Sequence, residues 1–102
     1  MIRVTKIEKI TGEYIICRLS NQELKRINLS SLISNHSHLK GIEKMKDPEY
    51  LLKADIGIFG EIFWPETITN RQGDTWNYDI SPEYILHFGE DVDIENESRL
   101  KV

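Results

Sequence analysis

The sequence predicts a small α+β domain: an antiparallel sheet, made of an N-terminal three-stranded meander and further short strands, with two or three short helices. Apolar and polar residues alternate through much of the first thirty positions, which is the period of half-buried strands. A capping residue precedes proline at Asp47-Pro48 and again at Ser81-Pro82, a pattern typical of helix starts. Residues 54–64 are apolar and contain glycines and aromatic residues, which favours short strands.

The N-terminal meander is expected to use three successive strands, at residues 1–10, 13–20 and 23–29. The middle strand is the clearest, because its apolar residues alternate between two faces. Thr11-Gly12 breaks the chain before it, and Asn21-Gln22 gives a weaker turn signal after it. Strands this close in sequence pair most simply with their neighbours, in antiparallel order.

Three helical segments follow from local signals. Residues 30–34 are polar at both ends and apolar within, which predicts a short helical turn. The Asp47-Pro48 start predicts a helix that ends near Lys53, with Asp47 accepting hydrogen bonds from free N–H groups of the first turn. The Ser81-Pro82 start predicts a second helix of the same kind, ending near Gly89.

Between these helices, residues 54–64 predict two short strands joined near Phe59-Gly60. The second strand is expected to stop at Trp64-Pro65, because proline cannot donate a hydrogen bond to a sheet ladder. Residues 66–75 are polar and are expected to form a loop with Gly73-Asp74 at its tip. The alternation of residues 76–80 predicts a last short strand.

The chain length and charge indicate one domain with an acidic tail. The 102 residues suit a single domain, which we place at 1–89. Residues 90–102 hold five acidic and two basic side chains, and the whole chain carries a net charge of -4. The domain itself is therefore nearly neutral, and it lacks the positive field that nucleic-acid backbones attract. We expect no nucleic-acid partner.

The expected location is the cytoplasm. The first ten residues contain four charged side chains and no apolar core, unlike a signal peptide. No segment approaches the roughly 20 apolar residues of a membrane span, so no membrane partner is expected. The single cysteine, Cys17, cannot form an intramolecular disulfide, and its place among apolar strand residues is typical of a small buried side chain.

Aromatic residues near one arginine form the candidate partner-binding site: Trp64, Arg71, Trp76 and Tyr78. Such a group can stack nucleobases, form a contact surface rich in Trp, Tyr and Arg, or cap the core of a small domain. Acidic residues interleave with this group, which disfavours the nucleic-acid reading. No catalytic residue is assigned, since no nucleophile–base or phosphate-loop pattern is present in the sequence.

His36 and His38 are weak candidates for a metal site. Alternate residues of an extended segment point the same way, so both imidazoles can face one ion. A zinc site needs a third ligand and usually a fourth, and no other residue lies at a diagnostic spacing. The competing reading is a solvated polar loop, and no cofactor is expected.

The acidic tail also has two readings. Val92 and Ile94 alternate with acids, as in a segment that adds a strand to a sheet edge. The other reading is a solvated terminus, because five of the thirteen residues from 90 to 102 are acidic.

Short motifs in order along the chain resemble a known family. They are Ile-Asn-Leu-Ser-Ser-Leu-Ile at 27–33, Lys-Asp-Pro-Glu-Tyr at 46–50, Trp64-Pro65, and Asp-Ile-Ser-Pro-Glu-Tyr-Ile at 79–85. Together they resemble the small bacterial family called domain of unknown function 2442, over about residues 1–88. This chain departs from the family pattern at Asn21-Gln22, where Asp-Gly is common, and in its longer segment after Trp64-Pro65.

The resemblance implies an α+β domain without established catalytic residues. It also implies a protein partner encoded by a neighbouring gene, in a pair that looks like a toxin–antitoxin system, and the acidic tail would suit a basic partner. The expected function is therefore a non-enzymatic protein-interaction module, and exposed strand edges also allow a homodimer. The alternative is a small-ligand-binding protein or enzyme that uses the region Trp64–Tyr84.

Overall fold

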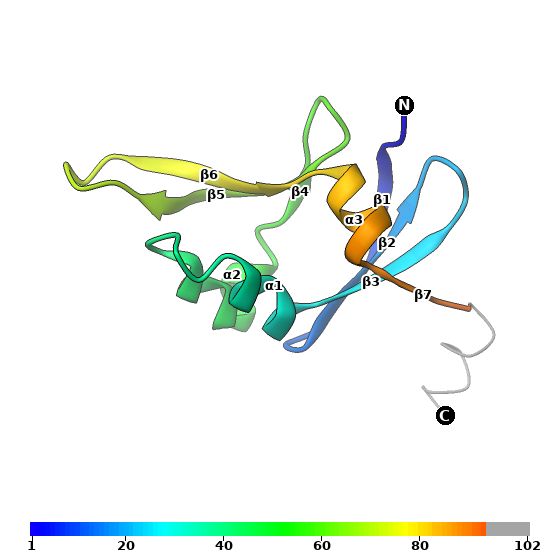
Figure 1. Cartoon of the computed structure of the whole chain (residues 1–102), viewed down its shortest axis with the longest axis horizontal. Coiled ribbons are helices and arrows are strands. Elements are labelled where there is room, and N and C mark those ends of the chain that lie inside the picture. Colours follow the sequence, from blue (N-terminus) through cyan, green and yellow to red (C-terminus); the bar gives the residue numbers. More distant parts are fainter. Residues whose placement is uncertain (94–102) are drawn as a thin grey trace.

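The computed structural model describes residues 1–93 of the chain, and it confirms the α+β class. Two antiparallel sheets, three short α-helices and one 3-10 helix make up these residues (Figure 1). The N-terminal meander is present as predicted, while the later strands form a sheet of their own. The part of the predicted acidic tail from residue 94 onward lies outside the described residues.

The first sheet contains the meander and one short added strand. Its strands are β1 Val4–Ile10, β2 Tyr14–Leu19, β3 Leu24–Asn28 and β7 Glu90–Asp91, in the spatial order β1-β2-β3-β7. The Thr11 hydroxyl accepts the backbone N–H of Tyr14 at 3.0 Å and so closes the first turn. All pairings are antiparallel. This is expected for β1, β2 and β3, which short turns join, whereas β7 reaches β3 from the far end of the described chain.

Residues 90 and 91 of the tail pair with the chain's own sheet. The Lys25 ammonium contacts the Asp91 carboxylate at 2.5 Å, and Arg26 contacts Glu90 at 3.5 Å. The N–H of Val92 donates to the Leu24 carbonyl at 3.1 Å. The start of the acidic segment therefore adds a strand, as one of its two readings expected, and basic residues of β3 neutralise its charge.

Four helical segments connect or cover the sheets: α1 Leu29–Asn35, η1 Ile42–Lys46, α2 Pro48–Leu51 and α3 Pro82–Phe88. Both predicted proline starts are confirmed. The Asp47 carboxylate accepts the N–H of Glu49 at 3.0 Å, and the Ser81 hydroxyl accepts the N–H of Tyr84 at 3.0 Å. Helix α2 is shorter than predicted, and α3 ends where the N–H of Gly89 donates to the Ile85 carbonyl.

The second sheet corrects the prediction that a strand stops at Trp64-Pro65 and that a loop follows over 66–75. Its strands are β4 Asp55–Ile56, β5 Ile62–Thr69 and β6 Thr75–Ile80, in that spatial order. β5 passes through Pro65 to Thr69, so only residues 70–74 connect it to β6. In Figure 1 this β5–β6 hairpin extends away from the first sheet.

A bulge explains why proline does not end the strand. Trp64 pairs with Tyr78, but the next pair is Ile68 with Trp76, so β5 has three residues between these pairs where β6 has one. Pro65 lies within this interruption, where a missing N–H removes no regular ladder bond. Glu66 adopts a positive φ of 50° inside the same bulge.

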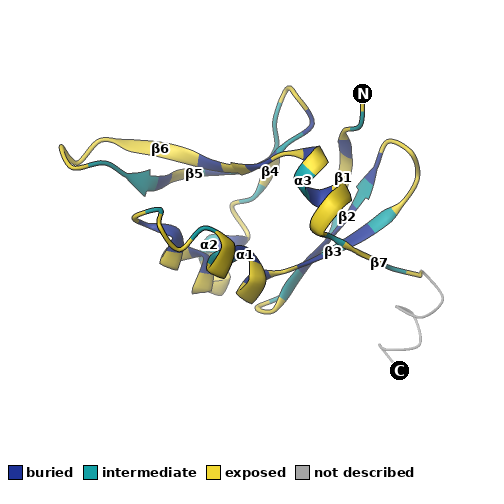
Figure 2. Ribbon diagram, viewed as in Figure 1, coloured by how far each residue is buried: buried dark blue, intermediate teal, exposed yellow. Residues whose placement is uncertain are grey.

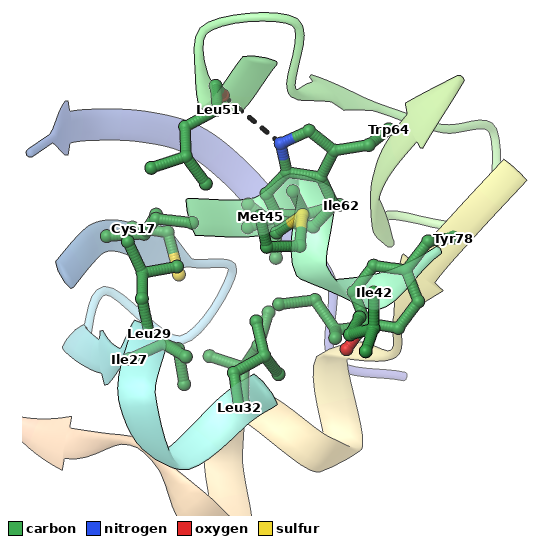
Figure 3. Close-up of a cluster of buried hydrophobic side chains, with 14 of the residues drawn as sticks. Cys17, Ile27, Leu29, Leu32, Ile42, Met45, Leu51, Ile62, Trp64 and Tyr78 are labelled. Carbon is green, nitrogen blue, oxygen red and sulfur yellow. Dashed lines mark hydrogen bonds between the residues drawn. The ribbon is translucent and has the colours of Figure 1, made fainter. Parts of the chain in front are cut away.

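The hydrophobic core lies between the two sheets and the helices (Figure 2). Figure 3 shows Cys17 from β2, Leu32 from α1, Met45 from η1 and Trp64 from β5 gathered in one cluster. The Trp64 indole is fully buried, and its N–H donates to the Leu51 carbonyl at 3.1 Å. The second sheet is thereby fixed to the rest of the domain through β5.

Candidate functional site

The β5–β6 hairpin carries all four residues predicted to bind a partner. Backbone hydrogen bonds order its tip. The Asn70 carbonyl accepts the N–H of Gly73 at 3.2 Å, and the N–H of Asn70 donates to the Asp74 carbonyl at 3.0 Å. The Asn70 side chain also accepts the N–H of Gln72 at 3.0 Å. Gly73 supplies the positive φ, 88°, that this turn requires.

The bulge side of the hairpin is held against the helices. The Tyr50 hydroxyl donates to the Pro65 carbonyl at 2.6 Å and also contacts the Thr67 hydroxyl. Thr67 is fully buried, and its hydroxyl donates to the Trp64 carbonyl at 3.1 Å. These contacts fix the position of the hairpin relative to the core.

The structure divides the four predicted contact residues into two pairs. Trp64 and Tyr78 are buried, with their rings stacked at a centroid distance of 5.8 Å. Trp76 keeps 53% of its surface exposed, and Arg71 is exposed at the hairpin tip. Only Trp76 and Arg71 are therefore available to a partner without rearrangement of the core.

The Tyr78 hydroxyl faces a histidine from the loop after α1. It lies 2.8 Å from Nδ1 of His36, and the same nitrogen lies 3.1 Å from the Leu32 carbonyl oxygen. Burial raises the pKa of Tyr78 well above its usual value, so this hydroxyl stays neutral. Within the Trp64–Tyr84 region named for the alternative ligand site, Tyr78 packs into the core and Trp76 is exposed.

The two candidate metal ligands lie near each other but share no third ligand in the described part. The rings of His36 and His38 are 6.4 Å apart between centroids. Nδ1 of His36 already faces two oxygen atoms. Among residues 1–93, no group of three or more His, Cys, Asp or Glu side chains lies close enough to hold a metal ion.

Cys17 lies in the core, as its sequence context predicts, and its accessible surface is zero. Burial raises the pKa of its thiol from the usual value near 9 to about 12. A thiol that is neutral and inaccessible at neutral pH is a poor nucleophile.

We expect Cys17 to resist alkylation by iodoacetamide in the native protein at neutral pH and to react fully in denaturant, as followed by mass spectrometry. Because the folded state holds the thiol proton more tightly, this group's contribution to stability is intact below about pH 9 and is lost as the pH rises toward about 12. Native-state labelling at the rate of a free thiol would contradict this burial.

Sequence reasoning missed one exposed apolar feature, the turn between β4 and β5. Ile58 is 81% exposed and Phe59 is 67% exposed. The sequence interpretation assigned the whole apolar segment to strands and placed these residues at a simple junction. The signal that marks the turn is the pair of glycines, Gly57 and Gly60, that flank two large apolar residues.

Comparisons with known proteins give no match: no family model, no curated protein and no solved structure is similar to this chain at a significant level. Among the described residues, no helix is both long and apolar enough to cross a membrane.

Proposed function

We propose that this chain is a non-enzymatic protein-interaction module of the cytoplasm and that its contact surface is the exposed part of the β5–β6 hairpin, with Trp76 at its centre. The exposure of Trp76 on an ordered hairpin is the observation that carries this proposal. Tryptophan contributes more binding energy than most residues when a partner covers it. An exposed tryptophan on an ordered strand also does not improve solubility, so its exposure is better explained by binding.

The position of Trp76 supports this role. It lies on β6, an end strand of the β4-β5-β6 sheet. An end strand offers backbone N–H and C=O groups to an added strand, while a nearby aromatic side chain supplies apolar contact. Arg71 at the hairpin tip adds a cation suited to planar hydrogen bonding.

Trp64 and Tyr78 take a different part in this proposal from the one the sequence suggested. They contact no partner, and they position the hairpin from within the core. Their ring stacking and the Trp64–Leu51 hydrogen bond anchor the strands whose far ends carry Trp76 and Arg71.

The partner that we propose is the small protein encoded by the adjacent gene, with this chain in the antitoxin-like position. The resemblance of the motifs at 27–33, 46–50 and 79–85 to domain of unknown function 2442 supports this choice. The net charge of -4 on the whole chain suits a basic partner.

We expect Trp76→Ala to weaken the complex with the adjacent gene product by about tenfold or more, which is a loss of at least about 1.4 kcal/mol of binding free energy, because tryptophan is among the residues that contribute most at the centre of an interface. The measurement is co-purification after co-expression, followed by titration calorimetry. Leu52→Ala is the matched control, since Leu52 is also a large exposed apolar residue, 69% exposed at the end of α2. Equal loss of affinity in both variants, or no loss in Trp76→Ala, would show that the hairpin is not the contact surface.

A further inference from the structure

A second exposed apolar feature lies on the turn between β4 and β5. Ile58 and Phe59 project into solvent there, and Figure 1 shows this turn rising beside the N-terminus. Two adjacent large apolar residues at such exposure resemble the centre of a binding surface more than part of a core.

Hydrogen bonds within the turn fix its shape. The N–H of Gly57 donates to the Glu61 carbonyl at 2.8 Å, and that of Gly60 donates to the Gly57 carbonyl at 3.0 Å. The Glu61 carboxylate accepts the N–H of Phe59 at 3.0 Å. Gly60 adopts a φ of 77°, which allows this closed geometry.

The turn is also fixed to the start of the first sheet. The N–H of Val4 donates to the Gly60 carbonyl at 2.9 Å, and the Arg3 guanidinium donates to the Ile58 carbonyl at 2.8 Å. Gly60 packs so closely that an added Cβ would lie 2.6 Å from Cβ of Arg3. The exposed pair is therefore presented in one orientation, which lowers the entropy cost of binding.

Three carboxylates line the same surface as Phe59. Glu61, Asp79 and Glu83 line a shallow pocket of about 330 Å³ together with Phe59, Met1 and the Ser81-Pro82 helix start. Glu61 immediately precedes β5, Asp79 lies on β6, and Glu83 lies in the first turn of α3. Within residues 1–93, none of the three forms an ion pair with a basic side chain. The nearby Arg3 guanidinium is bonded to a backbone carbonyl instead.

Phe63 extends the apolar surface along the sheet. It pairs with Asp79 across the strands, and alternation places it on the opposite face from the buried Ile62 and Trp64. It is half-buried and stands outside the main core cluster. We call the resulting surface the outer face; its residues are Ile58, Phe59, Glu61, Phe63, Asp79 and Glu83.

We infer that the outer face binds an extended or helical segment of another protein in which an aromatic or aliphatic side chain is flanked by lysine or arginine. The inference rests on the proposed interaction function and names its partner chemistry. The partner's apolar side chain covers Ile58, Phe59 and Phe63. Its lysine or arginine side chains pair with the three carboxylates, which form no ion pair with a basic side chain of residues 1–93. A second copy fits poorly, because two outer faces would oppose their carboxylates and each chain carries a net charge of -4.

The test uses a random peptide library displayed on phage and selected against the full chain. We expect the recovered peptides to combine apolar residues with Lys or Arg. Their synthetic versions should bind Phe59→Ala about tenfold more weakly than wild type, and the double variant Asp79→Asn/Glu83→Gln should lose binding to a similar extent. All three positions are exposed, so these variants should remain folded.

The matched control removes two acids elsewhere, in Glu13→Gln/Glu43→Gln. Both residues are exposed and lie outside the outer face. Equal weakening in this control and in Asp79→Asn/Glu83→Gln would show general charge attraction and overturn the inference. Recovery of acidic or uncharged peptides would also overturn it, as would a dimer in analytical ultracentrifugation that Phe59→Ala abolishes.

The proposed function fails separately from this inference. If the adjacent gene product binds through Trp76 while the outer-face variants bind peptides and partner normally, the interaction function stands and the outer-face inference is wrong. If neither the gene product nor any library peptide binds the full chain, both are wrong.

Discussion

Alanine at Gly41 is expected to lower the free energy of unfolding by about 3 kcal/mol or more, which is severe for a small domain. Gly41 has a φ of 107°, a backbone conformation that is strained for any residue with a side chain. An added Cβ would also lie only 2.0 Å from the backbone oxygen of Thr67. That oxygen cannot move freely, because Thr67 is buried in the bulge and Thr69 donates to the Lys40 carbonyl at 3.0 Å.

Urea unfolding followed by circular dichroism measures this loss. Gly12→Ala is the matched control, since Gly12 has a negative-φ backbone and no atom within 4 Å of an added Cβ. We expect the control to change stability by no more than about 1 kcal/mol. Similar losses in the two variants would contradict the close packing of the β5 bulge against the start of η1.

Trp64→Ala is expected to cost about 3–5 kcal/mol of unfolding free energy, the range for a large aromatic residue removed from a core. Trp64 is completely buried and contacts both the Tyr78 ring and the Leu51 carbonyl (Figure 3). Its loss leaves a cavity and removes one of the two hydrogen bonds that the Leu51 carbonyl accepts, the other coming from the N–H of Ala54. Many molecules of this variant should be unfolded at 37 °C.

Trp76→Ala provides the comparison for the same measurement. Since Trp76 is about half exposed, its removal should change the unfolding free energy by about 0.5 kcal/mol or less. Thermal melts of both variants therefore separate a structural tryptophan from an exposed one. Equal destabilisation would show that Trp76 belongs to the core and would remove the basis for the contact surface.

The elements that the sequence predicts well depend on local signals. The meander follows from alternation and short turns, and the Asp47-Pro48 and Ser81-Pro82 helix starts follow from side-chain capping. Each signal acts between residues close in the chain, so no knowledge of the tertiary structure is needed to interpret it.

The hairpin could not be predicted because its bulge depends on distant residues. Pro65 is a correct local signal for an interrupted ladder, but the strand continues because Tyr50 binds the Pro65 carbonyl and Gly41 leaves room for Thr67. These contacts join segments 15 to 26 positions apart in sequence. Only the packed structure shows that they outweigh the missing hydrogen bond.

The candidate site was predicted in composition but not in exposure. Trp76 and Tyr78 are two residues apart on one strand, which predicts the same face for both. Tyr78 lies over His36 and is buried, whereas Trp76 is closer to the hairpin tip, where less of the domain covers it. The exposure of Ile58 and Phe59 was also not predicted. An apolar segment between two strands is usually buried, so the sequence favours a core position for both residues.

We propose above that this chain binds a protein through the β5–β6 hairpin. Amide hydrogen exchange of the chain alone and in the purified complex with the adjacent gene product tests it most directly, because exchange is read segment by segment. We predict slower exchange on binding over residues 70–80, with β1 unchanged. The absence of a complex at micromolar concentration, or protection limited to β1 and β2, would contradict the claim.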